Sequence, residues 1–256
     1  MLAPSAADFL VMTQNAWGGA PLWRRREERL ARILAERSPA VLGMQEIRAA
    51  SASGLESQAH SLARRASGYT PFFWPSHLGK DGACEGVALL CRDDLELLDH
   101  ATERLSLDPD DALDRVTQRI VARTSLRFRG VVIDVFVTHL PISKRARART
   151  VHEVLTFAEE GRKASGSQGA VLMGDFNATP REEPIRALEA TWTDAWSAVH
   201  PGELGATWPS VAPVTRIDYV FAQLGAGWEI VEAARAPFAG SDHAGVLATI
   251  RLPPRG

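Results

Sequence analysis

Asp175 and Asn177 form the strongest chemical pattern in the sequence, because they stand two residues apart directly after the apolar run 171–173. In an extended segment, side chains two residues apart project to the same side. The carboxylate can take up a proton or bind a hard cation, and the carboxamide can donate hydrogen bonds to an oxyanion. The structural alternative is an Asx turn, in which both side chains bond the local backbone. On these two residues alone both interpretations stay open.

Other ionisable side chains also stand next to apolar runs. His139 closes a long apolar run, and Glu46 directly follows another. Asp242 and His243 stand just before a third. Each position has a structural alternative: a strand-end histidine, a helix cap or surface ion pair for the glutamate, and a loop turn for the Asp-His pair. No single position decides, although loops at strand ends are where a rigid scaffold presents reactive groups.

Taken as an ordered set, these segments point to one family. The set is Asn15, Gln45-Glu46, Thr138-His139, Gly174-Asp175-Phe176-Asn177, Arg216-Ile217-Asp218-Tyr219 and Ser241-Asp242-His243. It resembles the endonuclease/exonuclease/phosphatase superfamily, which includes pancreatic-type deoxyribonuclease, apurinic-site endonucleases, inositol-polyphosphate 5-phosphatases and neutral sphingomyelinases. The resemblance covers nearly the whole chain, 11–250. It implies a four-layer α/β/β/α sandwich and divalent-metal-dependent cleavage of phosphoester bonds by in-line attack of an activated water.

The resemblance also implies a metal site. Glu46 would be a ligand, with Asn15 nearby, and Asp242 would be either a second metal ligand or a general-base partner close to the phosphate. Hard oxygen ligands suit Mg²⁺, which keeps several of its waters and takes few protein ligands. The expected cofactor is therefore Mg²⁺ or Mn²⁺.

Roles for the remaining site residues follow from the same resemblance. Asp175 would orient or deprotonate the attacking water, while Asn177 and His139 would hold the phosphoryl oxygens. Asp218 would fix the tautomer and orientation of His243, as an acid partner does for a catalytic imidazole. These roles match what phosphoester cleavage requires, namely charge neutralisation on the non-bridging oxygens and a positioned water.

Glu85 has two interpretations. In the deoxyribonuclease branch of the family a glutamate at the start of this strand pairs with the first catalytic histidine, and Glu85 would serve His139 in that way. The alternative is a loop acid that flanks a strand. The basic run 144–149 is similarly open: it is either a solvated helix face or a source of one or two arginines that reach a substrate phosphate.

The branch of the family is less defined than the family itself. The segment 15–18, an arginine-bearing helix and Gln45-Glu46 look most like the neutral sphingomyelinases, yet no apolar hairpin for membrane insertion is visible. The segment 216–219 lacks the tryptophan and Asp-Arg of the 5-phosphatases, and Gly245 stands where many members have proline.

Three functions follow from the resemblance. The leading prediction is a phosphodiesterase acting on a nucleic acid, a nucleotide-like diester or a phospholipid headgroup. A phosphomonoesterase acting on a small phosphorylated metabolite is the alternative. A catalytically inactive binding module on the same fold is the third, and the complete set of acids, amides and histidines argues against it.

These residues need strands and helices that bring them together. The predicted strands span 9–12, 40–44, 69–74, 86–91, 118–128, 131–137, 170–173, 217–221 and 246–250, and the predicted helices span 21–38, 53–65 and 144–163. The Gly- and Ser-rich stretch 161–169 is predicted as a loop. Strands with one apolar face, mixed with helices, predict two sheets packed face to face with helices outside, in a single domain over 1–256 with its core at about 9–252.

Composition limits the remaining possibilities. The chain has 256 residues, 45% of them hydrophobic, and a net charge of -2, which argues against disorder and against a general basic coat for nucleic acid. Cys84 and Cys91 lack metal-ligand spacing and are expected to be free thiols. No signal peptide and no apolar run of about 18 residues is visible, so a cytoplasmic location is expected. The sequence leaves the oligomeric state open.

Overall fold

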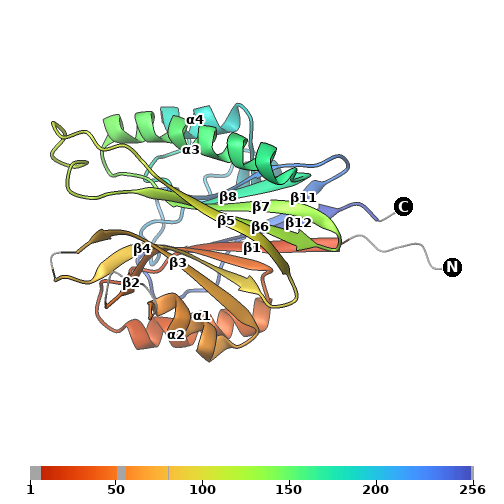
Figure 1. The fold of residues 1–256 in the computed structure, drawn as a ribbon, viewed down its shortest axis with the longest axis horizontal. Coiled ribbons are helices and arrows are strands. Elements are labelled where there is room, and N and C mark those ends of the chain that lie inside the picture. The colour runs from red at the N-terminus through yellow and green to blue at the C-terminus, as the bar shows by residue number, and fades with distance from the viewer. Residues whose placement is uncertain (1–6, 51–55, 80, 255–256) are drawn as a thin grey trace.

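The computed structural model describes residues 7–50, 56–79 and 81–254. Within them, two six-stranded sheets pack face to face. Helices α1 and α2 cover the outer face of one sheet, and α3 and α4 cover the outer face of the other (Figure 1). This confirms the predicted α/β/β/α sandwich.

The first sheet is built from the two ends of the described chain. Its strands, in spatial order, are β11 (Glu229–Arg235), β12 (Val246–Leu252), β1 (Ala7–Asn15), β2 (Val41–Ala49), β4 (Cys84–Arg92) and β3 (Tyr69–Leu78). Strands β1 and β2 are parallel, and all other neighbours in this sheet are antiparallel.

The second sheet is built from one continuous stretch of chain, 96–223. Its strands, in spatial order, are β5 (Glu96–Arg104), β6 (Ile120–Phe128), β7 (Val131–His139), β8 (Gly169–Asp175), β10 (Asp218–Gln223) and β9 (Thr193–Asp194). Only β7 and β8 are parallel. The sequence of this sheet is therefore inserted between β4 and β11 of the first.

The helices are α1 (Trp23–Arg37), α2 (Gln58–Ala66), α3 (Lys144–Ser165), α4 (Glu183–Glu189) and α5 (Ala195–Val199). The predicted loop 161–169 is wrong at its start, because α3 continues to Ser165 and includes Gly161. The helix stops at Gly166, which has a φ of 65° and donates its N–H to the carbonyl of Arg162. Of the predicted helix 53–65, residues 53–55 lie outside the described residues.

Alternating side chains on each strand enter two different cores. On β7, Val135 and Val137 point into the core between the sheets, while Phe136 packs against α3. On β1, Val11 points between the sheets, and Met12 packs with residues of α1 and α2. Strands buried on both faces explain why the sequence shows continuous apolar runs that end in polar residues.

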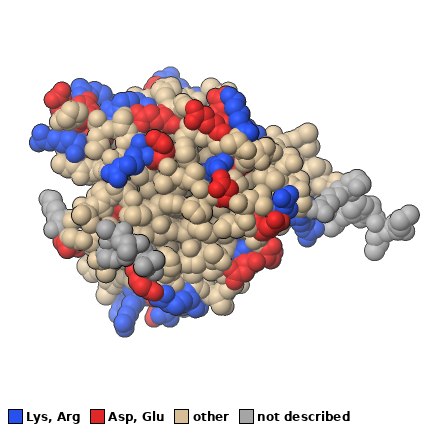
Figure 2. All heavy atoms as spheres, viewed as in Figure 1, with Lys and Arg blue, Asp and Glu red and all other residues tan. Residues whose placement is uncertain are grey.

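The two cysteines and the surface charges agree with the predictions made from the sequence. Cys84 and Cys91 are buried free thiols on β4, and burial raises the pKa of Cys91 to about 12. Figure 2 shows acidic and basic side chains next to one another on the face it presents, in line with the small net charge. None of the described helices is long and apolar enough to cross a membrane.

Candidate active site

Strand register brings the polar strand ends to one edge of the sandwich. In the first sheet, Asn15 at the end of β1 is the partner of Gln45 on β2. In the second sheet, Asp175 at the end of β8 is the partner of His139 on β7 and of Asp218 on β10. Backbone pairing therefore fixes the spacing of three of the predicted site residues before any side-chain contact is considered.

Glu46 reaches the same edge through an irregularity in β2. The pairing of β2 with β4 shifts register between Met44 and Ile47, and Glu46 between them has a φ of 56°. A bulge of this kind redirects a side chain at the cost of local strand regularity. The Glu46 carboxylate accepts a hydrogen bond from Asn15 Nδ2 at 2.9 Å. The helix-cap alternative for Glu46 is therefore wrong, because the residue lies within a strand.

The Asn15 side chain connects the two sheets. Its Nδ2 donates to Glu46 Oε1 on the first sheet and, at 3.0 Å, to Asp175 Oδ2 on the second. Its Oδ1 accepts the backbone N–H of Trp17 at 3.0 Å, which fixes the orientation of the amide. The residue is fully buried. Asn15 thus holds two carboxylates at a fixed separation across the seam between the sheets.

Asp175 is the central carboxylate of the site. It is buried, and its Oδ1 accepts the backbone N–H of Asn177 at 2.9 Å. Burial, together with the neighbouring charge of Asp218, raises the pKa of Asp175 to about 7. The preceding Gly174 has a φ of 156°, and a Cβ atom there would lie 2.1 Å from the carbonyl oxygen of Thr138. Glycine is required for β8 to approach β7 this closely.

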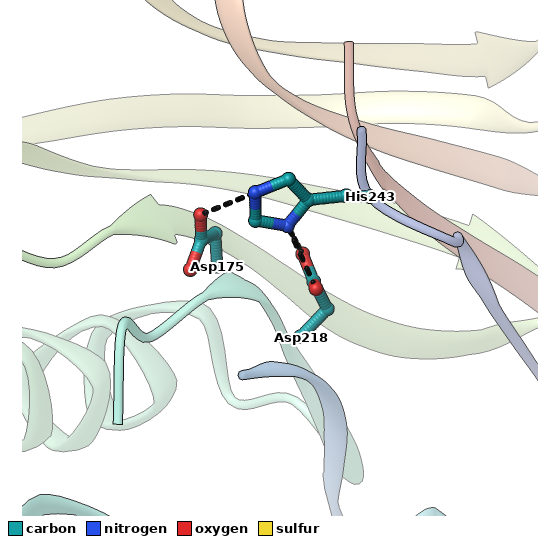
Figure 3. Close-up of side chains that lie close together, drawn as sticks. All are labelled: Asp175, Asp218 and His243. Carbon is teal, nitrogen blue, oxygen red and sulfur yellow. Dashed lines mark hydrogen bonds and ion pairs between the residues drawn. The ribbon is translucent and has the colours of Figure 1, made fainter. Parts of the chain in front are cut away.

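Asp218 and His243 form a buried pair beside Asp175 (Figure 3). His243 Nδ1 lies 2.9 Å and 3.1 Å from the two carboxylate oxygens of Asp218, and its Nε2 lies 3.8 Å from Asp175 Oδ2. Burial opposes the charged imidazole, but the charge and hydrogen bond of Asp218 outweigh it and raise the pKa of His243 to about 10. His243 is therefore a cation at neutral pH.

His139 has the opposite electrostatic state. Its Nε2 lies 3.4 Å from the same Asp175 Oδ2 and 3.1 Å from Asn177 Nδ2. Its Nδ1 lies 2.9 Å from a guanidinium nitrogen of Arg119. Burial first, and then the positive charges of Arg119 and His243, hold the pKa of His139 well below its usual value. His139 is therefore neutral at pH 7.

Glu85 and Asp242 lie at the margin of this cluster. Glu85 has its Oε1 3.9 Å from His77 Nε2, and Arg119, rather than Glu85, occupies Nδ1 of His139. The Asp242 carboxylate has a weak contact with Ser241 Oγ at 3.4 Å, and its charge acts on His243 and Arg26. Neither residue hydrogen-bonds to Glu46 or Asn15 among the described contacts.

Sequence reasoning missed Arg119, which lies just before β6. Nothing marks it among the many arginines of the chain, since its contact with His139 exists only after β6 and β7 pair. The arginines of 144–149, the alternative source of phosphate contacts in this segment, pair with acids in the structure. These pairs are Arg145 with Asp108, Arg147 with Glu182, and Arg149 with Asp114.

The oxygen donors of the site fit a hard divalent cation. Burial raises the pKa of Glu46, the hydrogen bond from Asn15 opposes this shift, and the like charge of Glu85 adds to it. A partly buried carboxylate with a raised proton affinity also favours a cation. Asp175, Asp218 and His243 also place one ligand atom each within 4.8 Å of one another. Because both Asp218 oxygens are engaged by His243, we regard that trio as a hydrogen-bonded pair facing Asp175 rather than as the metal site.

Comparison with known proteins identifies the family. A family model described as "Endonuclease/Exonuclease/phosphatase family" matches residues 12–243. A search of curated proteins gives no match.

Solved structures share the fold over nearly the whole chain. An endonuclease/exonuclease/phosphatase family protein from Bacteroides thetaiotaomicron has a TM-score of 0.77 and 19% identity, over 98% of this chain and 97% of that one. The human nocturnin catalytic domain with bound sulfate anion has a TM-score of 0.73 and 19% identity, over 96% and 97%. A mannosyl-6-phosphatase from Bacteroides thetaiotaomicron has a TM-score of 0.73 and 19% identity, over 94% and 99%.

Proposed function

The chain belongs to the endonuclease/exonuclease/phosphatase family, whose members hydrolyse phosphoester bonds, and from this premise we propose that it is a divalent-metal-dependent phosphodiesterase. The observation that carries the proposal is the convergence of three nitrogen atoms on one carboxylate oxygen. Asp175 Oδ2 lies 3.0 Å from Asn15 Nδ2, 3.4 Å from His139 Nε2 and 3.8 Å from His243 Nε2. Such a site can hold a water and an anionic phosphoryl group side by side.

Asp175 supplies the base. A carboxylate with a pKa of about 7 is matched to proton transfer near neutral pH, because it is available unprotonated and still has affinity for a proton. In the proposed reaction Asp175 orients the attacking water and takes its proton as the water oxygen bonds to phosphorus. The opposite bond, from phosphorus to the leaving oxygen, breaks, and its electron pair stays on that oxygen.

The two histidines and Asn177 stabilise the phosphoryl oxygens. His243, held as a cation by Asp218, offers a charged N–H to an oxygen that gains negative charge in the transition state. His139 and the Asn177 amide, 3.1 Å apart, offer neutral donors beside the same carboxylate. These groups are preorganised by buried hydrogen bonds, so little rearrangement is needed as charge develops.

Glu46 and Asn15, with Asp242 at the margin, would hold the metal ion. Mg²⁺ or Mn²⁺ bound there would neutralise phosphoryl charge and lower the pKa of a bound water. The amide of Asn15 fixes the Glu46 carboxylate at 2.9 Å and keeps it next to Asp175.

We propose a phosphodiester as the substrate class: a nucleic acid, a nucleotide-like diester or a phospholipid headgroup. A small phosphorylated metabolite, cleaved as a monoester, is the alternative. Its support is the fold shared with a protein named as a mannosyl-6-phosphatase.

A paired assay with bis-p-nitrophenyl phosphate and p-nitrophenyl phosphate tests the proposal. We expect the diester to be cleaved faster, activity to disappear in EDTA, and Mg²⁺ or Mn²⁺ to restore it. Faster cleavage of the monoester would establish the alternative. Full activity after exhaustive chelation would refute the metal requirement.

The same assay needs an active-site variant and a matched control. His243→Ala should lower kcat roughly 10²–10⁴-fold, the scale of losing one acid–base or electrostatic element. His152→Ala is the control, because His152 is exposed and its ring contacts Glu183 on the outer helices. Equal activity of both variants would place the catalytic site elsewhere.

A further inference from the structure

Arg119 is a buried cation that the proposed reaction does not yet use. The residue is 8% exposed, and one guanidinium nitrogen, Nη1, lies 2.9 Å from His139 Nδ1. Its Nε has no hydrogen-bond partner within the described part of the chain. The backbone carbonyl of Arg119 accepts the N–H of Leu105 at 2.9 Å and Gln118 Nε2 at 2.8 Å, so the residue is anchored at its main chain.

Hydrogen-bond chemistry fixes the direction of the Arg119–His139 contact. A guanidinium has only N–H donors and remains protonated in proteins. His139 Nδ1 must therefore accept, and a neutral imidazole that accepts at Nδ1 carries its proton at Nε2. The contact selects one of the two neutral tautomers.

The Asn177 amide on the Nε2 side of the ring is also a donor, so the neutral ring cannot accept from both of its neighbours. Asn177 Nδ2 lies 3.1 Å from Nε2, but the same amide group donates to the carbonyl of Leu140 at 3.0 Å. A neutral imidazole has a single acceptor nitrogen, and the guanidinium has no acceptor to offer in any orientation. Nδ1 is therefore the acceptor. The Nε2 proton is left facing Asp175 Oδ2 at 3.4 Å, where the proposed reaction places the water and the phosphoryl group.

Arg119 is held in this position by opposite charge on several sides. Burial lowers its pKa, and the nearby carboxylates of Glu85, Asp175, Glu46 and Asp114 oppose that shift. Removing the guanidinium would take away a positive charge that acts on all four of these acids. The same positive charge disfavours a second proton on His139.

We propose that Arg119 is a positioning residue for phosphoester cleavage, which acts by donating to His139 Nδ1 and so presenting an Nε2–H donor to the phosphoryl oxygen beside Asp175. The inference rests on the proposed function for the role of His139, but the tautomer itself is a property of the protein without substrate. It also assigns a different partner to His139 than the glutamate expected from the deoxyribonuclease branch.

The first test is a nitrogen NMR spectrum of the wild-type protein labelled in its histidine side chains, at pH 7 and without substrate. His139→Gln identifies the His139 resonances by their loss. We expect the pattern of a neutral imidazole protonated at Nε2. A neutral ring protonated at Nδ1, or a charged ring, would overturn the proposal whether or not the protein cleaves diesters.

Variants of Arg119 supply the functional test. In Arg119→Met, His139 should no longer be restricted to the tautomer protonated at Nε2. The kcat on bis-p-nitrophenyl phosphate should fall by roughly 10- to 100-fold, the scale of removing a partner that orients a site histidine, and KM should change less. Arg119→Lys keeps a cationic donor and should recover part of kcat together with the Nε2–H pattern.

The matched control is Arg123→Met. Arg123 is likewise buried and lies on β6, but its guanidinium contacts Asp99 and the carbonyl of Gly161, away from the site. Arg123→Met should lower the melting temperature about as much as Arg119→Met does, but it should leave the His139 tautomer and kcat unchanged. Equal kcat losses in Arg119→Met and Arg123→Met would overturn the proposal. If Arg119→Met does not fold, the wild-type spectrum and Arg119→Lys decide.

Discussion

The two histidines of the site are similar in position and opposite in charge. His139 ends β7 of the second sheet, and His243 stands before β12 of the first, yet both place Nε2 within 4 Å of Asp175 Oδ2, at 3.4 Å and 3.8 Å. Both rings are buried. Burial and Arg119 hold the pKa of His139 well below its usual value. Burial also lowers the pKa of His243, but Asp218 outweighs this effect and raises the pKa to about 10.

The difference shows that the partner on the far ring nitrogen decides the charge of a buried imidazole. A guanidinium on Nδ1 of His139 leaves a neutral donor, and a carboxylate on Nδ1 of His243 leaves a cationic one. Environments that push the pKa values of neighbouring groups apart assign them different roles in catalysis. Substitutions of Asp175, of Asp218 and of the two histidines change, in turn, the shared carboxylate, the partner of one ring and the rings themselves.

Asp175→Asn removes the carboxylate that both imidazoles face and should have the largest effect. The amide cannot take a proton from water, so kcat should fall by roughly 10²–10⁴-fold at nearly constant shape. Steady-state kinetics on the diester, with circular dichroism to verify folding, measures it.

Asp134→Asn is the control for this change. Asp134 is a buried aspartate on β7 whose carboxylate accepts from the hydroxyls of Ser125 and Ser165. The folded fraction of Asp134→Asn should have the wild-type kcat, even if the variant is less stable. An Asp175→Asn enzyme that turns over at the wild-type rate would remove Asp175 from the chemistry.

Asp218→Asn changes the partner of one ring only. Burial lowers the pKa of His243, and the Asp218 carboxylate raises it. Without that negative charge the pKa of His243 should drop, so the ring should lose its proton at lower pH. We expect kcat to fall by roughly 10- to 100-fold, the pKa read from the pH–rate profile to move downward, and KM to change much less. A raised KM or metal requirement with an unchanged pH profile would make Asp218 a binding ligand instead.

The smallest effect concerns stability against pH, where the two rings should act in opposite directions. The folded-state pKa of His243 lies above the unfolded value, so its contribution is present below pH 6.5 and is lost as pH rises toward about 10. The folded-state pKa of His139 lies below the unfolded value, so its contribution is lost as pH falls below 6.5. Each ring changes the unfolding free energy by at most about 1.4 kcal/mol per pH unit.

Melting temperatures in EDTA at pH 5, 6.5 and 9 would reveal these contributions. Relative to wild type, His243→Asn should lose less stability between pH 6.5 and 9, and His139→Asn should lose less between pH 6.5 and 5. The same slope in both variants would mean that the rings share one charge state and that the comparison fails.

Strand ends were predictable from the sequence because strands buried on both faces are continuous apolar runs. His139, Asp175 and Asp218 stand where such runs stop or start, and register then aligns them. The exposed strand β5 was missed, since its residues are almost all exposed and carry no alternation of apolar and polar side chains.

Contacts that depend on tertiary packing were not predictable. Arg119 fell inside a predicted strand, 118–128, and its partner His139 is identified only once the loop before β6 is placed against the end of β7. The bulge at Glu46 has no sequence signal, because the residue is neither glycine nor asparagine although its φ is 56°. In both cases the surrounding structure overrides local preference.

The insertion of the second sheet between β4 and β11 has a consequence for synthesis on the ribosome. The strands of 96–223 are all made before β12, so the second sheet can form while the edge of β1 that receives β12 is still open. An open strand edge is a template for pairing with other chains. The strand that closes this edge, β12, begins three residues after His243. The ribosome therefore adds the last residue of the proposed catalytic set just before the strand that protects the nascent chain from misassembly.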